Sequence, residues 1–257
     1  MVINRIRQHV RAHNWFAVAV DLAIVIAGVF LGVQATRWND RRIEHDQSVS
    51  YRSRLIRELD FNAGQYERQR AYYEQVRGHA LATRAALRGE REQSGRDFLI
   101  HAYQSTQIDI TPAKRFIYDE MVSAGLGARI GTENEQAQVS DYYTNASGAE
   151  ATYGAIPKYR ALMRTLIPQE AQAEIRDKCG DIRLRQNGLI IGSRLPESCD
   201  AILDDAVVEE GVARIQRETG LQDELNHYLA WINEKSGSLQ RLRDQSRTLR
   251  RLLIEED

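Results

Sequence analysis

The sequence predicts a mainly α-helical protein in which an N-terminal transmembrane helix continues into a long helix, and that helix packs in a bundle with a long C-terminal helix. One small β-hairpin is expected near residues 182–192. Three observations predict this fold class: an apolar run near the N-terminus, heptad spacing of apolar residues in two segments, and an Asn-Gly pair between the two cysteines. Proline is rare, with 4 residues in the chain, which also favours helix.

Three parts follow from these observations. Residues 1–14 form a short basic segment, residues 15–38 the transmembrane helix, and residues 39–257 a helical domain that contains the 179–199 hairpin loop. The 35 basic and 36 acidic residues nearly cancel, so a nucleic-acid partner is not expected.

The transmembrane prediction depends on the run from Phe16 to Val33, which is apolar or small at every position except Asp21. At about 1.5 Å per residue, the run nearly crosses a hydrocarbon core of roughly 30 Å. Trp15 and Trp38 bracket it as interfacial aromatic residues. Two alternatives stay open: a cleaved signal peptide, because a small-residue cleavage pattern follows the run, and a buried core helix.

One face of this helix carries small residues and one acid. At 100° per residue, five positions fall within about 60° of one another, and they are Ala17, Asp21, Gly28, Gly32 and Ala35. The two glycines form a G-x-x-x-G pattern, which lets a second helix approach closely. This stripe is predicted to bind a second copy or a partner's helix. The alternative is that the glycines are merely tolerated and that the acid lies near the membrane surface.

Cys179 and Cys199 are the two cysteines, and Asn187-Gly188 between them is the preferred centre of a type I′ hairpin turn. Folding the chain about this turn places Cys179 opposite residue 196, close to Cys199. A disulfide is therefore predicted, with two unpaired buried thiols as the alternative. Two cysteines without a neighbouring histidine do not make a zinc site.

The orientation in the membrane depends on this cysteine pair. Basic residues are more frequent after the apolar run than before it, which would place the domain in the cytoplasm, yet long domains translocate largely regardless of flanking charge. A disulfide is useful only in an oxidising compartment. The chain is therefore expected to cross the membrane once, with the C-terminal domain outside the cytoplasm.

After the membrane, a heptad stripe predicts that helix continues to Gly89. Its members are Leu55, Leu59, Tyr66, Tyr73, Val76, Ala80 and Leu87. A short amphipathic segment follows at residues 98–103. Thr111-Pro112 is expected to start another helix, with Thr111 as the N-cap, and Gly125 to end it.

Thr132 and Glu135 predict a capping box for the next helix, which is expected to break between Gly148 and Pro157 and to stop at Pro168. The C-terminal segment has a second heptad stripe. Its members are Leu225, Tyr228, Ile232, Leu239, Leu242, Leu249 and Leu253. The two long helices are expected to pack together, although a coiled coil with another subunit would satisfy the same pattern.

Residues that could carry chemistry are few. Glu224 and His227 have the spacing of half a di-iron site, but the sequence has no second such pair, so no metal and no cofactor are predicted. Asp97 and His101 lie one helical turn apart and predict a surface ion pair. No phosphate-binding loop, nucleophile elbow or zinc-protease motif is present in the sequence, so an enzyme is not expected.

Several of these features occur together in one known group. A basic start, NRIRQHV, precedes the acid and the apolar run, and the run closes with QATRWNDRR. This order resembles a family of uncharacterised bacterial single-pass membrane proteins, whose transmembrane helix ends in Gln-x-x-x-Trp-Asn-Asp/Glu. The matching residues here are Asp21, Gln34, Trp38, Asn39 and Asp40, with a similar later step at Ser123-Ala124-Gly125-Leu126 and Tyr142-Tyr143. The resemblance implies a helical domain held at the bacterial inner membrane by a single pass, and the expected disulfide then puts the C-terminal domain in the periplasm.

Two functions are compatible with these expectations. The first is a membrane-anchored interaction or scaffold protein without catalytic activity, whose partners are the lipid bilayer and either a second copy or another membrane protein. The alternative is an extracytoplasmic sensor or small-ligand-binding module, with a molecule held in the bundle core and the hairpin as a lid.

Overall fold

The computed structural model describes residues 15–255, so the predicted basic segment, residues 1–14, lies outside the described residues. The chain divides into two compact units, Met1–Ser53 and Arg54–Asp257. Helix α2 (Trp15–Leu87) contributes to both. Each unit is described by itself below.

In the first unit, α2 begins at Trp15 and contains the predicted transmembrane segment. Its large apolar side chains are exposed; Leu22, for example, is 59% exposed and Phe30 is 60% exposed. Among the described residues, this is the one helix that is long and apolar enough to cross a membrane. The predicted N-terminal apolar helix is therefore present, and its large apolar side chains are exposed within the described residues.

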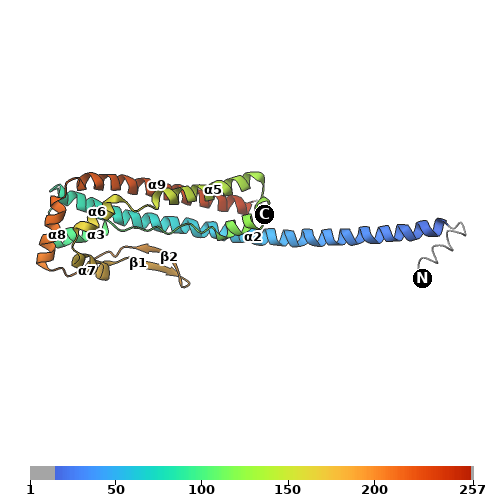
Figure 1. Cartoon of the computed structure of the whole chain (residues 1–257), viewed down its shortest axis with the longest axis horizontal. Coiled ribbons are helices and arrows are strands. Elements are labelled where there is room, and N and C mark those ends of the chain that lie inside the picture. The colour runs from blue at the N-terminus through green and yellow to red at the C-terminus, as the bar shows by residue number, and fades with distance from the viewer. Residues whose placement is uncertain (1–14, 256–257) are drawn as a thin grey trace. The chain divides into compact units, whose positions relative to one another are not determined.

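In the second unit, the rest of α2 packs against α9 (Leu221–Glu255), and the two helices run antiparallel (Figure 1). Arg77 of α2 bonds Asn233 near the start of α9, whereas Ser246 further along α9 bonds the carbonyl of Leu59. The predicted pairing of the two long helices is confirmed, and it occurs within one chain.

Both heptad stripes lie in this interface. All the predicted stripe residues are buried except Leu87, which is half-buried at the end of α2. Gly89, with φ +69°, follows the last turn of α2 and ends the helix as predicted. Helix α5 (Glu133–Tyr153) also packs on α9.

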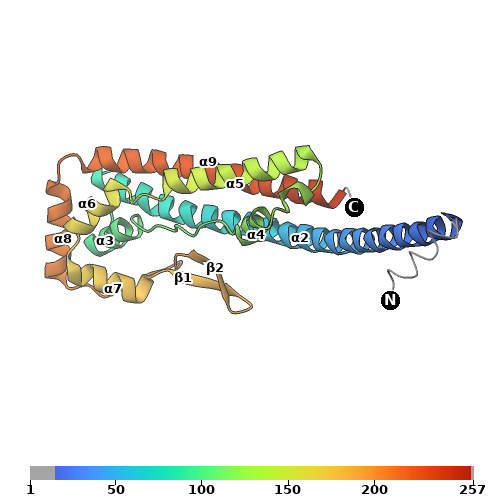
Figure 2. The ribbon, with the colours of Figure 1, turned by 45° about the vertical axis from the view of Figure 1, so that its right-hand side comes forward.

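Short helices close one end of the bundle (Figure 2). They are α3 (Gly95–Gln104), α6 (Lys158–Leu166), α7 (Gln169–Cys179) and α8 (Asp205–Arg217). The sequence did not predict α8. Gly211 in its middle is a poor helix former, but it provides space for two neighbours, because an added Cβ would lie 2.9 Å from Pro168 and 3.1 Å from Leu99.

Two of the predicted helix boundaries can be compared directly with the structure. The capping box at Thr132 and Glu135 starts α5, and the predicted break follows, with α5 ending at Tyr153. The predicted start at Thr111-Pro112 is wrong, because the segment remains extended until α4 (Phe116–Ser123) begins. A short 3₁₀ turn, η1 (Gly127–Arg129), lies between α4 and α5.

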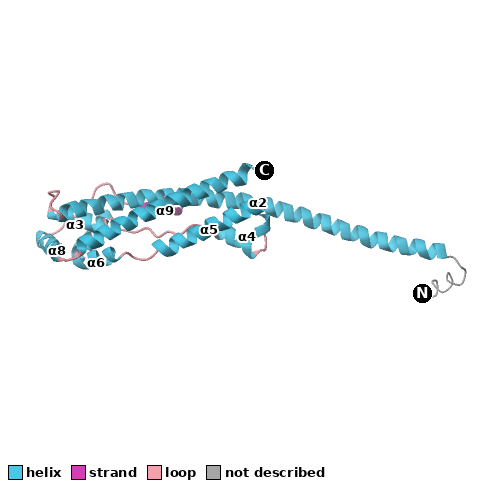
Figure 3. Cartoon of the chain, turned by 90° about the horizontal axis from the view of Figure 1, so that it is seen from above, coloured by secondary structure: helices cyan, strands magenta, loops and turns pink. Residues whose placement is uncertain are grey.

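The hairpin consists of β1 (Ile182–Gln186) and β2 (Leu189–Arg194), which pair antiparallel (Figure 2). Figure 3 shows that helices make up most of the second unit. Asn187 and Gly188 have φ of 51° and 79°, the positive values that a type I′ turn requires. The register shifts by one residue at Leu184/Arg185, where β2 carries an extra residue.

Candidate functional site

A polar stripe on α2 binds the extended segment that precedes α4. The stripe consists of Glu58, Asn62, Gln65 and Gln69. Asn62 donates to the carbonyl of Lys114 at 2.7 Å and accepts from its N–H at 2.8 Å. Gln65 and Gln69 both donate to the carbonyl of Thr111, at 3.1 and 2.7 Å. These side chains satisfy backbone groups that a helix would have satisfied itself. This explains why no helix starts at Thr111.

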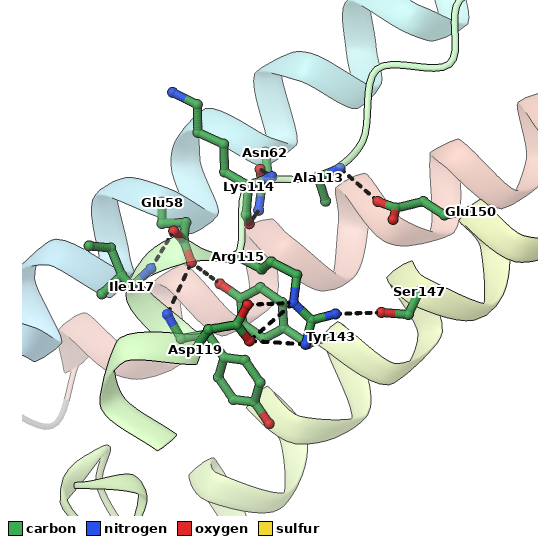
Figure 4. A network of polar contacts seen from close by, with 11 residues as sticks. Glu58, Asn62, Ala113, Lys114, Arg115, Ile117, Asp119, Tyr143, Ser147 and Glu150 are labelled. Atoms are coloured by element: carbon green, nitrogen blue, oxygen red, sulfur yellow. Dashed lines mark hydrogen bonds and ion pairs between the residues drawn. The ribbon is translucent and has the colours of Figure 1, made fainter. Parts of the chain in front are cut away.

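Glu58, the next polar residue of this stripe, caps α4 from outside (Figure 4). Its carboxylate accepts from the N–H of Ile117 at 2.9 Å, more weakly from that of Tyr118 at 3.4 Å, and from the hydroxyl of Tyr143 at 2.6 Å. No local side chain caps α4. A negative charge at this end also interacts favourably with the helix dipole.

The other side of the extended segment is bound to α5 (Figure 4). Glu150 accepts from the N–H of Ala113 at 2.7 Å, and Arg115 donates to the hydroxyl of Ser147 at 2.8 Å. Arg115 also pairs with Asp119 at 2.9 Å. The segment is therefore held between α2 and α5, and its backbone forms one wall of a cavity.

The cavity has a volume of about 260 Å³ and lies between α2, the extended segment, α5 and α9. Most of its lining is apolar, and side chains from three helices provide it: Tyr66, Ala146, Ala149, Tyr153, Leu239 and Leu242. Polar groups come from Gln69, Asp109, Thr111, Glu150, Lys235 and Ser238. An apolar cavity with a few convergent polar groups is the usual form of a small-molecule site.

Lys235 of α9 is buried beside this cavity, with 6% of its surface exposed. Its ammonium group donates to the hydroxyl of Tyr73 at 2.8 Å and to the carbonyls of Asp109 and Tyr153 at 3.3 and 3.4 Å. It also lies over the rings of Tyr73 and Trp231. Burial lowers the pKa of Lys235 to about 8, although the Asp109 carboxylate opposes this shift.

Asp109 is 7% exposed and has two unlike carboxylate oxygens. One oxygen, Oδ1, accepts from the N–H and the hydroxyl of Thr111 at 2.9 and 2.6 Å, and from Gln69 at 3.5 Å. The other oxygen, Oδ2, is buried and accepts no hydrogen bond from the described residues. A buried acceptor without a partner is uncommon and costly.

The predicted disulfide is present, and the hairpin does not line the cavity described above. Cys179 and Cys199 are joined, with their Cα atoms 5.2 Å apart. Both hairpin strands lie outside the set of residues that line the cavity. The hairpin packs on α2 instead, where Arg68 donates to the carbonyl of Ile191 at 2.7 Å.

The predicted ion pair between Asp97 and His101 is wrong. Asp97 pairs with Arg96, and the Nδ1 atom of His101 lies 2.8 Å from Nδ1 of His79 on α2. In such a bond one ring nitrogen donates and the other accepts, so at least one ring is neutral. Burial and the neighbouring His101 lower the pKa of His79 to about 4. Burial also lowers the pKa of His101, Arg91 lowers it further, and Asp97 opposes this.

This histidine pair is expected to make stability depend on pH. Because the folded pKa of His79 lies below its ordinary value, the unfolded chain binds more protons as the pH falls from about 6.5 to 4. The free energy of unfolding should therefore drop by about 2–3 kcal/mol over this range. Urea unfolding of the full chain in detergent measures this drop. His79→Gln should make it smaller, whereas His227→Gln, a change at an exposed position of α9, should not; equal drops in both variants would contradict the assignment.

The predicted association residues all lie on α2. The stripe residues Ala17, Asp21, Gly28, Gly32 and Ala35 fall between Trp15 and Trp38, and both tryptophans are exposed. A Cβ added at Gly28 or at Gly32 would meet no atom within 4 Å. Within the described residues, this face of the helix is therefore open to a partner.

Glu224 and His227, which have the spacing of half a di-iron site, lie in different surroundings. Glu224 pairs with Lys158, and His227 is exposed. Across residues 15–255, no group of three or more His, Cys, Asp or Glu side chains could hold a metal ion.

Sequence reasoning missed the cavity, Lys235, Asp109 and the polar stripe. A signal for the stripe did exist, since Glu58, Asn62, Gln65 and Gln69 recur at helical spacing beside the apolar heptad.

No family model, curated protein or solved structure matches the chain.

Proposed function

We propose that this chain is a non-enzymatic interaction or scaffold protein, anchored in the bacterial inner membrane by one transmembrane helix. The observation that carries the proposal is a contrast along α2. Its heptad stripe beyond Arg54 is covered by the chain, whereas its N-terminal apolar side chains are exposed on all faces. A helix that is apolar all round requires lipid or protein around it.

The disulfide supports a periplasmic domain, because structural disulfides persist in oxidising compartments. The resemblance of Asp21 and the Gln34-to-Asp40 ending to bacterial single-pass membrane proteins supports the same assignment. In this arrangement the helical bundle presents its surface outside the cytoplasm.

Association is assigned to the stripe of Ala17, Asp21, Gly28, Gly32 and Ala35. The glycines let a second helix come close enough for backbone contact. The carboxyl group of Asp21 would be costly against lipid tails and less so beside a partner helix. The partner is a second copy of this chain or the helix of another membrane protein.

Crosslinking in native membranes tests this assignment. The double change Gly28→Leu with Gly32→Leu should reduce crosslinked complexes roughly tenfold, equivalent to about 1.4 kcal/mol of association free energy. Helical geometry provides a matched control, because Ala19 and Ala23 have the same spacing on the opposite face. Ala19→Leu with Ala23→Leu should leave crosslinking unchanged. Loss in the alanine pair alone would assign association to the other face.

A second function, a sensor or small-ligand-binding module, is favoured by the cavity beside Lys235. The cavity combines mostly apolar walls with the charged residues Asp109, Glu150 and Lys235 in its lining. Ligand binding there would act on α2 directly, because Tyr66 and Gln69 of α2 line the cavity.

A further inference from the structure

Lys235 differs from the other lysines of the chain in its surroundings. The sequence has four lysines, and three of them are exposed: Lys114, Lys158 and Lys178. Lys235 is 6% exposed and belongs to the lining of the cavity. Lysine is seldom buried without a charged partner. The groups around its side-chain nitrogen therefore decide in which protonation state it is buried.

The hydrogen-bond acceptors of Lys235 are all uncharged. They are the hydroxyl of Tyr73 at 2.8 Å and the carbonyls of Asp109 and Tyr153 at 3.3 and 3.4 Å, and the two longer bonds are weak. Within residues 15–255, no carboxylate accepts a hydrogen bond from this nitrogen. Burial without a bonded carboxylate disfavours the ammonium form. With its pKa lowered to about 8, roughly one Lys235 side chain in ten is a neutral amine at pH 7.

The cavity gives a ligand access to this amine. Two of its acceptors are carbonyls of residues that line the cavity, so the end of the side chain lies among the lining residues. The cavity opens to solvent, because Ile110 and Glu150, which also line it, are exposed. A neutral lysine amine in apolar surroundings is a nucleophile that adds to carbonyl carbons.

From these observations we propose that the cavity binds a small apolar aldehyde, which Lys235 holds as a reversible imine. The neutral amine adds to the carbonyl carbon, and a C=N bond replaces the C=O bond. Both hydrogens of the amine leave with the carbonyl oxygen as one molecule of water, so neither an oxidant nor a reductant is consumed. The assignment rests on the second function proposed above, a ligand-binding module, and names its ligand class.

The surroundings of Lys235 suit the imine. An imine is neutral, so its formation removes the charge from a mostly apolar environment. The carbonyl of Asp109 keeps its hydrogen bond from the hydroxyl of Tyr73 at 2.8 Å. The carbonyl of Tyr153 loses the longest of the three bonds. Benzene fills a cavity of about 150 Å³, so a cavity of about 260 Å³ has room for an aromatic aldehyde such as benzaldehyde.

Reductive trapping of the full chain in detergent micelles tests the imine. The chain is incubated at pH 7 with benzaldehyde and cyanoborohydride, which reduces an imine to a stable benzylamine, and the labelled lysines are identified by peptide mass mapping. Lys235 should be labelled at least tenfold faster than the three exposed lysines, since a lysine with the usual pKa of about 10.4 is almost wholly protonated at this pH. Faster labelling of the exposed lysines would overturn the proposal.

Competition and matched variants locate the reaction. Benzyl alcohol has a similar shape and no carbonyl group, so an excess should slow labelling of Lys235 at least fivefold and leave the exposed lysines unchanged. Ala149→Phe fills the cavity and should slow labelling of Lys235 by a similar factor, whereas Ala151→Phe, at an exposed position of the same helix, should not. Labelling of Lys235 that neither benzyl alcohol nor Ala149→Phe slows would overturn the site.

Calorimetric titration with benzyl alcohol separates this proposal from the function on which it rests. Binding of the alcohol without trapping at Lys235 would overturn the aldehyde assignment and leave a ligand-binding module in place. Absence of both binding and trapping would overturn both, and would leave the anchored interaction function to the crosslinking test.

Discussion

Replacing Glu58 with alanine is expected to lower the free energy of unfolding of the second unit by about 3 kcal/mol. The change removes the acceptor of the Ile117 N–H, which is half-buried, and of the Tyr143 hydroxyl, which is buried. It also removes a negative charge from the N-terminus of α4. The buried Tyr143 hydroxyl, which loses a charged partner, accounts for the largest part of the loss.

Urea unfolding of the full chain in detergent, followed by near-UV circular dichroism, measures this effect. Glu58→Gln keeps one acceptor oxygen and should lose about half as much. The control is Glu74→Ala on the same helix, which removes only an exposed ion pair with Arg77 and should change stability by less than about 0.5 kcal/mol. Equal losses in Glu58→Ala and Glu74→Ala would show that the cap adds no stability.

Breaking the disulfide is expected to cost roughly 3 kcal/mol, because Cys179 and Cys199 close a loop of 20 residues in the unfolded chain. Cys179 lies at the buried end of α7, so the bridge connects the hairpin loop to the helical core. Cys179→Ser, Cys199→Ser and the double change should lose the same amount, since each removes the same constraint.

Reduction provides the matched control for the disulfide. Reductant should lower the unfolding midpoint of the unchanged chain and leave the double serine variant where it was. Thiol labelling of cells expressing the unchanged chain should require reduction first. Labelling of both cysteines without reductant would contradict the bridge and, with it, the argument for a periplasmic domain.

Features that depend on neighbours along the chain could be predicted from the sequence. The apolar run, the two heptad stripes, the capping box at Thr132 and Glu135, and the turn at Asn187-Gly188 are local patterns with fixed spacing. Each of these patterns strongly favours one local conformation, so the two long helices, the start of α5 and the hairpin lie where they were expected. The disulfide followed from the hairpin, because the turn brings its two cysteines close together.

The candidate site, in contrast, depends on contacts between residues that are distant in the chain. Thr111-Pro112 has the local chemistry of a helix start, yet Gln65 and Gln69, more than forty residues earlier, bind its carbonyls and keep the segment extended. The meeting of Lys235 with Asp109, and of His79 with His101, likewise joins residues that are distant in the chain. The partners in hydrogen bonds of this kind are set by tertiary packing and not by spacing along the sequence.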